Sequence, residues 1–93
     1  MRIEWLPEAA RNLTVQIDRI AERDPWAAID IGDAVHAAVS RLAVHPTIGR
    51  PGRTTGTREL VVVGTPYVVV SRIVRAVVLV LRILHGAQRW PPV

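Results

Sequence analysis

The chain contains no cysteine among its 93 residues. This absence excludes disulfides, thiolate zinc sites and thiol nucleophiles, so the fold must be held together by packing alone. A chain of this length builds one modest hydrophobic core, and we expect a single domain over residues 1–93. Because nothing in the chain needs an oxidising compartment, we expect the protein to act in the cytoplasm.

The sequence also lacks an apolar run long enough to cross a membrane. Arg72, Arg75 and Arg82 interrupt its most hydrophobic region. The first residues do not show the charged start, apolar stretch and small-residue cleavage site of a signal peptide. We therefore expect a soluble, unexported protein with no membrane partner.

Lysine is missing too, so all twelve basic residues are arginine, and the formal net charge is +4. The charge is unevenly distributed: four arginines face seven acids up to Asp33, whereas eight arginines face only Glu59 from Ala34 onward. A genome that favours arginine codons would explain the missing lysines but not this segregation. The basic second half indicates an acidic partner, either a nucleic acid or an acidic protein segment.

Motifs of the common enzyme classes are absent as well. The chain has no glycine-rich phosphate loop with its lysine, no nucleophile elbow, no dinucleotide fingerprint and no histidine pair at metal-ligand spacing. We predict neither a metal site nor a cofactor. His36 lies on the polar side of a predicted helix and His45 precedes a proline at its end, so we interpret both as surface residues.

The first half of the chain shows one strand signal and two helix signals. Residues 2–5 alternate in polarity, which predicts a short strand. Pro7 and the dipeptide Asp24-Pro25 are helix starts, although Leu6 is a poor cap. Apolar residues follow each start at spacings of three and four, which predicts two amphipathic helices. Gly32 lies inside the second helix, where the close approach of another backbone would explain it.

After a segment rich in proline and glycine at 46–56, the sequence takes on the composition of strands. Valine, isoleucine and leucine dominate three runs, at 60–63, 67–73 and 77–84. We predict an α+β fold: an N-terminal strand, a two-helix hairpin and then three antiparallel strands that form a sheet packed on the helices. The register of these strands stays open at this stage.

Several predicted strands are apolar on both sides; for example, Val61 and Val63 alternate with Leu60 and Val62. One layer of helices covers only one face of a sheet. We therefore expect an exposed apolar patch on the second face, where a partner protein binds. The alternative is that the tail and the long loop fold over that face.

His85 ends the last predicted strand, with Arg82 before it and Arg89 and Trp90 after it. Strand ends are places where a rigid scaffold presents functional groups. A histidine can act as a base, and nearby guanidinium groups can hold a phosphate. The alternative is a histidine that only anchors the tail.

Other arginines extend this basic region. Arg58 opens the first strand after the loop, and Arg72 and Arg75 flank the next hairpin. Each arginine taken singly is equally well explained as a solvated surface residue. The complete set that could share one positive face is Arg50, Arg53, Arg58, Arg72, Arg75, Arg82 and Arg89.

Six segments follow one another along nearly the whole chain: residues 5–10, the helix start at 24–25, residues 42–52, Gly56–Leu60, Gly64–Val70 and Leu81–Pro91. In their order and spacing they resemble the RelE/ParE superfamily of type II toxin-antitoxin toxins, and its ParE branch in particular. The last three segments carry most of the resemblance. The sequence departs from common family forms at Leu6, where a capping serine or threonine is usual, and at Ser71, where tyrosine is frequent.

The resemblance implies an antiparallel sheet packed against a helical hairpin, and a cognate ParD-like antitoxin that wraps over the toxin. The ParE branch is associated with poisoning of DNA gyrase, whereas the RelE branch cuts messenger RNA on the ribosome. Fold alone does not distinguish these activities. The chain has no lysine, Tyr67 is its only tyrosine, and Val68 stands where some RNA-cutting relatives have arginine. These residues favour the gyrase branch.

Three hypotheses follow. The first is a non-enzymatic toxin that inhibits DNA gyrase, is neutralised by its antitoxin and meets nucleic acid only through its target or antitoxin. The second is a ribosome-dependent endoribonuclease. The third is a non-toxic member that retains only antitoxin binding. The partner-binding residues of the first hypothesis are Arg58, Tyr67, Arg72, His85, Arg89 and Trp90, and the catalytic residues of the second are Arg58, Arg72 and Arg82 for phosphate with His85 as base.

Overall fold

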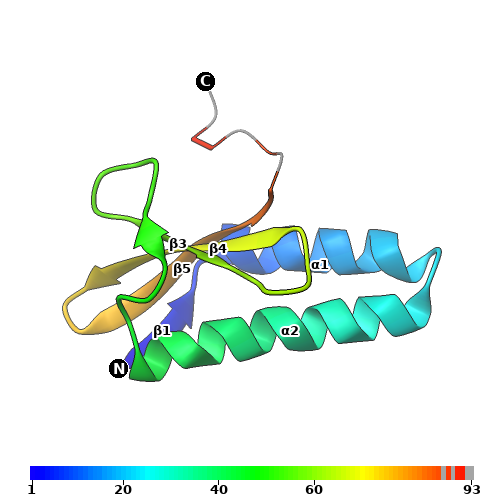
Figure 1. The fold of residues 1–93 in the computed structure, drawn as a ribbon, viewed down its shortest axis with the longest axis horizontal. Helices are drawn as coiled ribbons and strands as arrows, with labels where there is room; N and C mark the ends of the chain where they lie inside the picture. The colour runs from blue at the N-terminus through cyan, green and yellow to red at the C-terminus, as the bar shows by residue number, and fades with distance from the viewer. Residues whose placement is uncertain (87, 89, 92–93) are drawn as a thin grey trace.

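Two long helices and a twisted sheet make up the fold (Figure 1). A computed structural model describes residues 1–86, 88, 90 and 91. A hairpin of two helices lies along the sheet, as predicted (Figure 1). In chain order the elements are β1 (Arg2–Trp5), α1 (Pro7–Ala21), α2 (Pro25–Val44), β2 (Arg50–Pro51), β3 (Arg58–Val61), β4 (Tyr67–Val74) and β5 (Val77–His85).

The sheet has the strand order β1-β5-β4-β3-β2. The predicted antiparallel strands are confirmed as β3, β4 and β5, but the sheet that contains them is mixed and larger than predicted. After β1 the helical hairpin leads the chain to β2 at the opposite edge of the sheet, and β1 pairs in parallel with the last strand, β5. β2 pairs with β3; it was missed because its two residues lie in the proline- and glycine-rich segment, where no strand period can be recognised.

The helix starts follow the chemistry of their first residues. Asp24 caps α2, since its carboxylate accepts a hydrogen bond of 3.1 Å from the backbone N–H of Ala27. Leu6 offers α1 no side-chain cap, and Pro7 instead occupies the first helical position. The apolar stripes of both helices face the sheet. Gly32 meets the Ile17 side chain, whose Cδ1 lies 3.6 Å from where a Cβ would be, and not another backbone as the sequence suggested.

The main core fills the space between the helices and the inner face of the sheet, which is the face that the helices cover. Val35 and Leu42 from α2 pack there against Val69 of β4 and Val78 of β5, and all four are fully buried. The inner face therefore supplies most of the apolar burial that stabilises the chain.

A bulge in β5 changes which side chains face the helices. Val70 pairs with Arg82 but Ser71 pairs with Val80, so Leu81 is an extra residue between them. Before the bulge, Val78 and Val80 lie in the inner core; after it, Ile83 does. The extra residue thus moves the inward positions of β5 from even to odd numbers.

The outer face of the sheet, opposite the helices, is partly covered by the end of the chain. Val68, Val70 and Leu84 are buried there against Leu81 and Trp90. The prediction of an exposed apolar patch is wrong for these three residues, because Trp90 of the tail packs over them, as the alternative held. Two apolar side chains beside this region stay accessible, since Val61 is 50% exposed and Val63 is 83% exposed.

Candidate partner-binding surfaces

A group of arginines on the outer face surrounds the carboxylate of Glu59. Glu59 pairs with Val70 across the strands, so both side chains lie on the outer face. Its Oε1 lies 3.2 Å from the guanidinium of Arg50 and 3.2 Å from that of Arg53. The side chain of Glu59 is fully enclosed. We call this group the outer-face cluster: Arg50, Arg53, Glu59, Arg72, Arg82 and Trp90.

Glu59 holds the loop between β2 and β3 onto the sheet. Its Oε2 accepts a hydrogen bond of 2.9 Å from the backbone N–H of Arg53. Burial raises the pKa of Glu59, but this hydrogen bond, the one from Arg50 and the charges of both arginines outweigh it, so the pKa lies below its ordinary value. The carboxylate is therefore the ionised centre around which the loop is arranged.

The same loop is linked to the chain end and to β4. Arg53 donates a hydrogen bond of 3.2 Å to the backbone oxygen of Gln88. Arg72 lies two residues after Val70 on the same face of β4 and donates to the backbone oxygen of Thr55 at 3.1 Å. Arginine side chains thus link the loop to the sheet, to the tail and to β4.

Arg82 and Trp90 complete this surface. The Arg82 guanidinium carbon lies 5.2 Å from the centroid of the Trp90 ring, which is within the range of a cation–π contact. Trp90 also packs on the apolar side chains Val68, Val70 and Leu84 beneath it. The outer-face cluster therefore combines an aromatic anchor with four arginines and one carboxylate, a composition common at protein interfaces.

Arg58 lies on the other side of β3. It pairs with Ser71, next to the outward-facing pair of Glu59 and Val70, so its position alternates to the inner face. Arg58 and Arg72 nevertheless both line a small pocket of about 100 Å³ beside Pro46, at the end of α2. The two arginines therefore meet at this end of the sheet.

Tyr67 and His85 face the helices. They pair across β4 and β5, with ring centroids 5.7 Å apart in an edge-to-face arrangement. Tyr67 is buried in the inner core, and its hydroxyl lies 3.4 Å from Oε1 of Gln16 on α1. The two aromatic rings line a groove of about 320 Å³ together with Gln16, Arg19, Ile20 and Arg23.

The structure separates the residues that sequence reasoning had grouped near His85. Arg82 lies on the outer face with Trp90, whereas His85 lies on the inner face with Tyr67. Arg58 and Arg72 lie at the Pro46 end of the sheet. Arg89 falls outside the described residues. Sequence reasoning missed Arg19 and Arg23, whose four-residue spacing places them on one side of α1 and its end, beside Gln16 and Ile20.

Neither a metal-binding cluster nor a membrane-spanning helix occurs among the described residues. In the part of the chain that the structure describes, no three histidine, aspartate or glutamate side chains come together as they would around a metal ion. Neither α1 nor α2 has the length and hydropathy needed to span a membrane, within those same described residues.

Comparison with known proteins gives the family. Residues 3–90 match the model of the ParE toxin of the type II toxin-antitoxin system parDE. The chain belongs to the ParE toxin family. It is 41% identical to "Putative toxin Y4kP" of Sinorhizobium fredii (strain NBRC 101917 / NGR234) over 92 residues, which cover 99% of this chain and 95% of the relative. The family assignment confirms the resemblance found in the sequence.

The fold also matches that of a solved structure. A structure described as the chromosomal ParDE TA system from P. aeruginosa superimposes with a TM-score of 0.83 over 91% of this chain and 95% of the other. The sequence identity is 24%, so this match concerns the fold. By its family match the protein is a ParE-family toxin of the type II toxin-antitoxin class, and an antitoxin is its expected class of partner.

Proposed function

We propose that this toxin acts in the cytoplasm as a single domain that inhibits DNA gyrase by binding it, and that a ParD-like antitoxin neutralises it. Membership of the ParE family supports this proposal. In this proposal the toxin needs no cofactor and forms no covalent bond with gyrase, because it inhibits the enzyme by non-covalent binding to its surface.

The placement of Arg82 and His85 favours binding over RNA cleavage. A general base and the cations that hold a cleaved phosphate must meet within hydrogen-bond reach of one substrate. Arg82 and His85 lie three residues apart in the regular part of β5 after the bulge, so strand alternation places them on opposite faces of the sheet. The four residues of the nuclease hypothesis therefore lie on several surfaces, whereas a protein that binds its target does not need them together.

The outer-face cluster is the surface we assign to the target. Tryptophan and arginine are the most frequent energetic anchors of protein interfaces. Trp90 and Arg82 are stacked and supported by buried apolar side chains, so they are already ordered before any partner arrives. An ordered anchor loses less conformational entropy on binding, which strengthens association.

A supercoiling assay with purified gyrase, run beside translation in a ribosome extract, tests the proposal. We expect the unaltered toxin to inhibit supercoiling and to leave translation intact, with its antitoxin restoring gyrase. The double variant Arg82→Ala/Trp90→Ala should lose most of this inhibition, and Trp26→Ala, at a tryptophan that is 78% exposed on α2, should keep it. Normal supercoiling at saturating unaltered toxin, with blocked translation, would instead support the endoribonuclease.

A further inference from the structure

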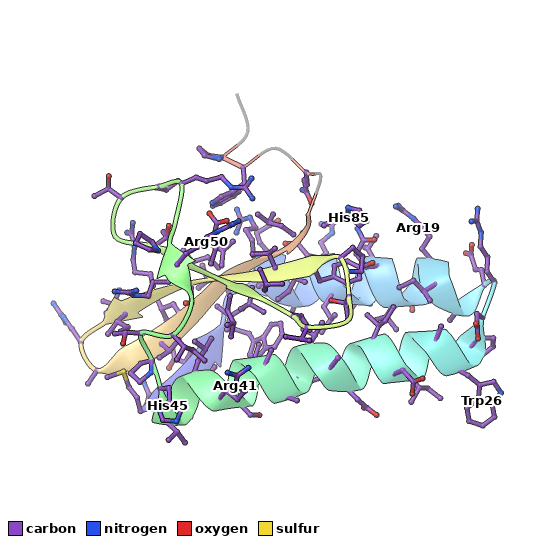
Figure 2. The ribbon with its side chains drawn as sticks, viewed as in Figure 1. Arg19, Trp26, Arg41, His45, Arg50 and His85 are labelled. Carbon is purple, nitrogen blue, oxygen red and sulfur yellow. The ribbon has the colours of Figure 1, made fainter. Side chains whose placement is uncertain are left out.

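The groove between the end of α1 and the paired residues Tyr67 and His85 is a second charged site, separate from the outer-face cluster. It has a volume of about 320 Å³. Arg19 contributes from the last turn of α1, and Arg23 from the turn that follows. Figure 2 shows Arg19 and His85 projecting on the same side of the molecule.

The two arginines of this groove have no counter-charge within the part of the chain that the structure describes. The residues that line it include no acid. Among the described residues, no carboxylate lies within 4.0 Å of either guanidinium, and neither side chain makes a hydrogen bond. Arg50, Arg53, Arg72 and Arg82, by contrast, all make polar contacts with the chain itself. The groove thus holds cations that the fold does not use.

The carbonyl oxygens at the end of α1 accept hydrogen bonds from backbone N–H groups and not from the guanidinium groups of Arg19 and Arg23. The backbone N–H of Glu22 bonds to Asp18 at 3.2 Å, and those of Arg23 and Asp24 bond to Ile20 at 3.0 and 2.8 Å. The helix end is therefore closed by its own backbone, as helix ends generally are. The side chains of Arg19 and Arg23 remain available for an external anion.

The floor of the groove is ordered and partly apolar. Ile20 packs on the main core, and the Tyr67 ring is buried. The Tyr67 hydroxyl lies 3.4 Å from Oε1 of Gln16, and the Tyr67 ring lies in an edge-to-face arrangement with the His85 ring. A partner side chain that enters here finds an apolar base with cations at the rim, which suits the methylene stem and carboxylate of glutamate or aspartate.

We infer that this groove binds an acidic side chain of the antitoxin, with Arg19 and Arg23 pairing to its carboxylate. The inference rests on the proposed neutralisation by an antitoxin and names one place where that partner is held. A nucleic acid fits less well, because its backbone needs a row of cations to meet successive phosphates. The described arginines of the outer-face cluster lie on the opposite face of the sheet from this groove.

Affinity for the cognate antitoxin, measured by calorimetry at low and at high salt, tests the inference. We expect Arg19→Gln/Arg23→Gln to weaken binding at least about tenfold, because it removes charge-assisted hydrogen bonds, and to flatten the salt dependence. Arg41→Gln, on the far end of α2 (Figure 2), makes the same kind of charge change away from the groove and should bind as the unaltered toxin does. Arg19→Lys/Arg23→Lys should retain most of the affinity.

The possible failures are distinguishable. Equal affinity and equal salt dependence of Arg19→Gln/Arg23→Gln and the unaltered toxin would overturn the inference and leave antitoxin neutralisation standing. Unaltered antitoxin affinity with loss of binding to a labelled DNA duplex would overturn it in favour of a phosphate site. Failure of the unaltered toxin to bind the antitoxin would overturn the proposed function and this inference together. Urea midpoints within error of the unaltered toxin would show that the variants fold.

Discussion

The backbone N–H of Arg53 and the carboxylate of Glu59 are joined by a hydrogen bond of 2.9 Å beneath the outer-face cluster. A carboxylate that is fully enclosed is expensive to bury unless cations and donors meet it. Here Arg50 and Arg53 supply both, at 3.2 Å each. The cluster that we assign to the target is therefore also a structural element, which ties the loop to the sheet.

The first prediction concerns the substitution Glu59→Gln. The amide keeps the shape of the side chain but leaves Arg50 and Arg53 without a counter-charge. We expect a loss of about 1–3 kcal/mol in the free energy of unfolding, below the full effect of a buried pair because both arginines are partly solvated. Urea unfolding followed by circular dichroism measures it.

Glu4→Gln is the matched control for this substitution. Glu4 also pairs with an arginine, Arg2 at 2.8 Å, but both side chains are more than half exposed. Exposed pairs of this kind contribute about 0–1 kcal/mol. Equal destabilisation by Glu59→Gln and Glu4→Gln would show that enclosure of Glu59 adds nothing.

The second prediction is a dependence of stability on pH. The pKa of Glu59 in the folded protein lies below its ordinary value of 4.5, because the bonds and charges of Arg53 and Arg50 outweigh the effect of burial. A depressed carboxyl pKa contributes stability that is present above the unfolded value and is lost as the pH falls through the folded value. The difference in unfolding free energy between the unaltered chain and Glu59→Gln should therefore shrink from about pH 7 to about pH 3. A difference that stays constant across this range would contradict it.

The third prediction concerns Trp90, which covers the outer apolar side chains. Trp90→Ala would expose Val68, Val70 and Leu84 and remove the ring beneath Arg82. We expect a loss of about 1–3 kcal/mol of unfolding free energy, less than for a fully buried tryptophan. Trp26→Ala, at an exposed site, should change it by less than about 0.5 kcal/mol. Similar losses in both variants would mean that Trp90 does not cover this face.

The order of helices and strands could be predicted because each one is marked by residues within it or directly beside it in the sequence. Asp24-Pro25 predicts a helix start from capping chemistry alone, and the structure confirms it. The parallel pairing of β1 with β5 could not be read, because it joins residues about 75 positions apart along the chain and has no local signal. The two-residue strand β2 is too short to show any period.

The candidate site was harder to predict, because the strand register decides which side chains share one face of the sheet. Arg82 and His85 are close in sequence, and regular alternation already sends residues three apart to opposite faces. Which face each one takes depends on the extra residue Leu81, and nothing in the run Val77–His85 marks that position as a bulge. The groove with Arg19 and Arg23 was missed because helical spacing shows which residues share a side of α1 but not what that side meets.

The last prediction concerns the turn between β4 and β5, where the chain uses residues that do not suit its geometry. Arg75 and Ala76 both have positive φ angles, of 50° and 62°. A two-residue hairpin with positive φ at both positions favours asparagine followed by glycine. Arg75→Asn/Ala76→Gly should therefore raise the unfolding free energy by about 1 kcal/mol and the melting temperature by about 4–8 °C.

Ala37→Gly, at an exposed position inside α2, makes the same alanine change in a helix and should instead lower stability by about 1 kcal/mol. Thermal unfolding compares the two directly, and a loss of stability in the turn variant would show that its residues are already suited to the hairpin.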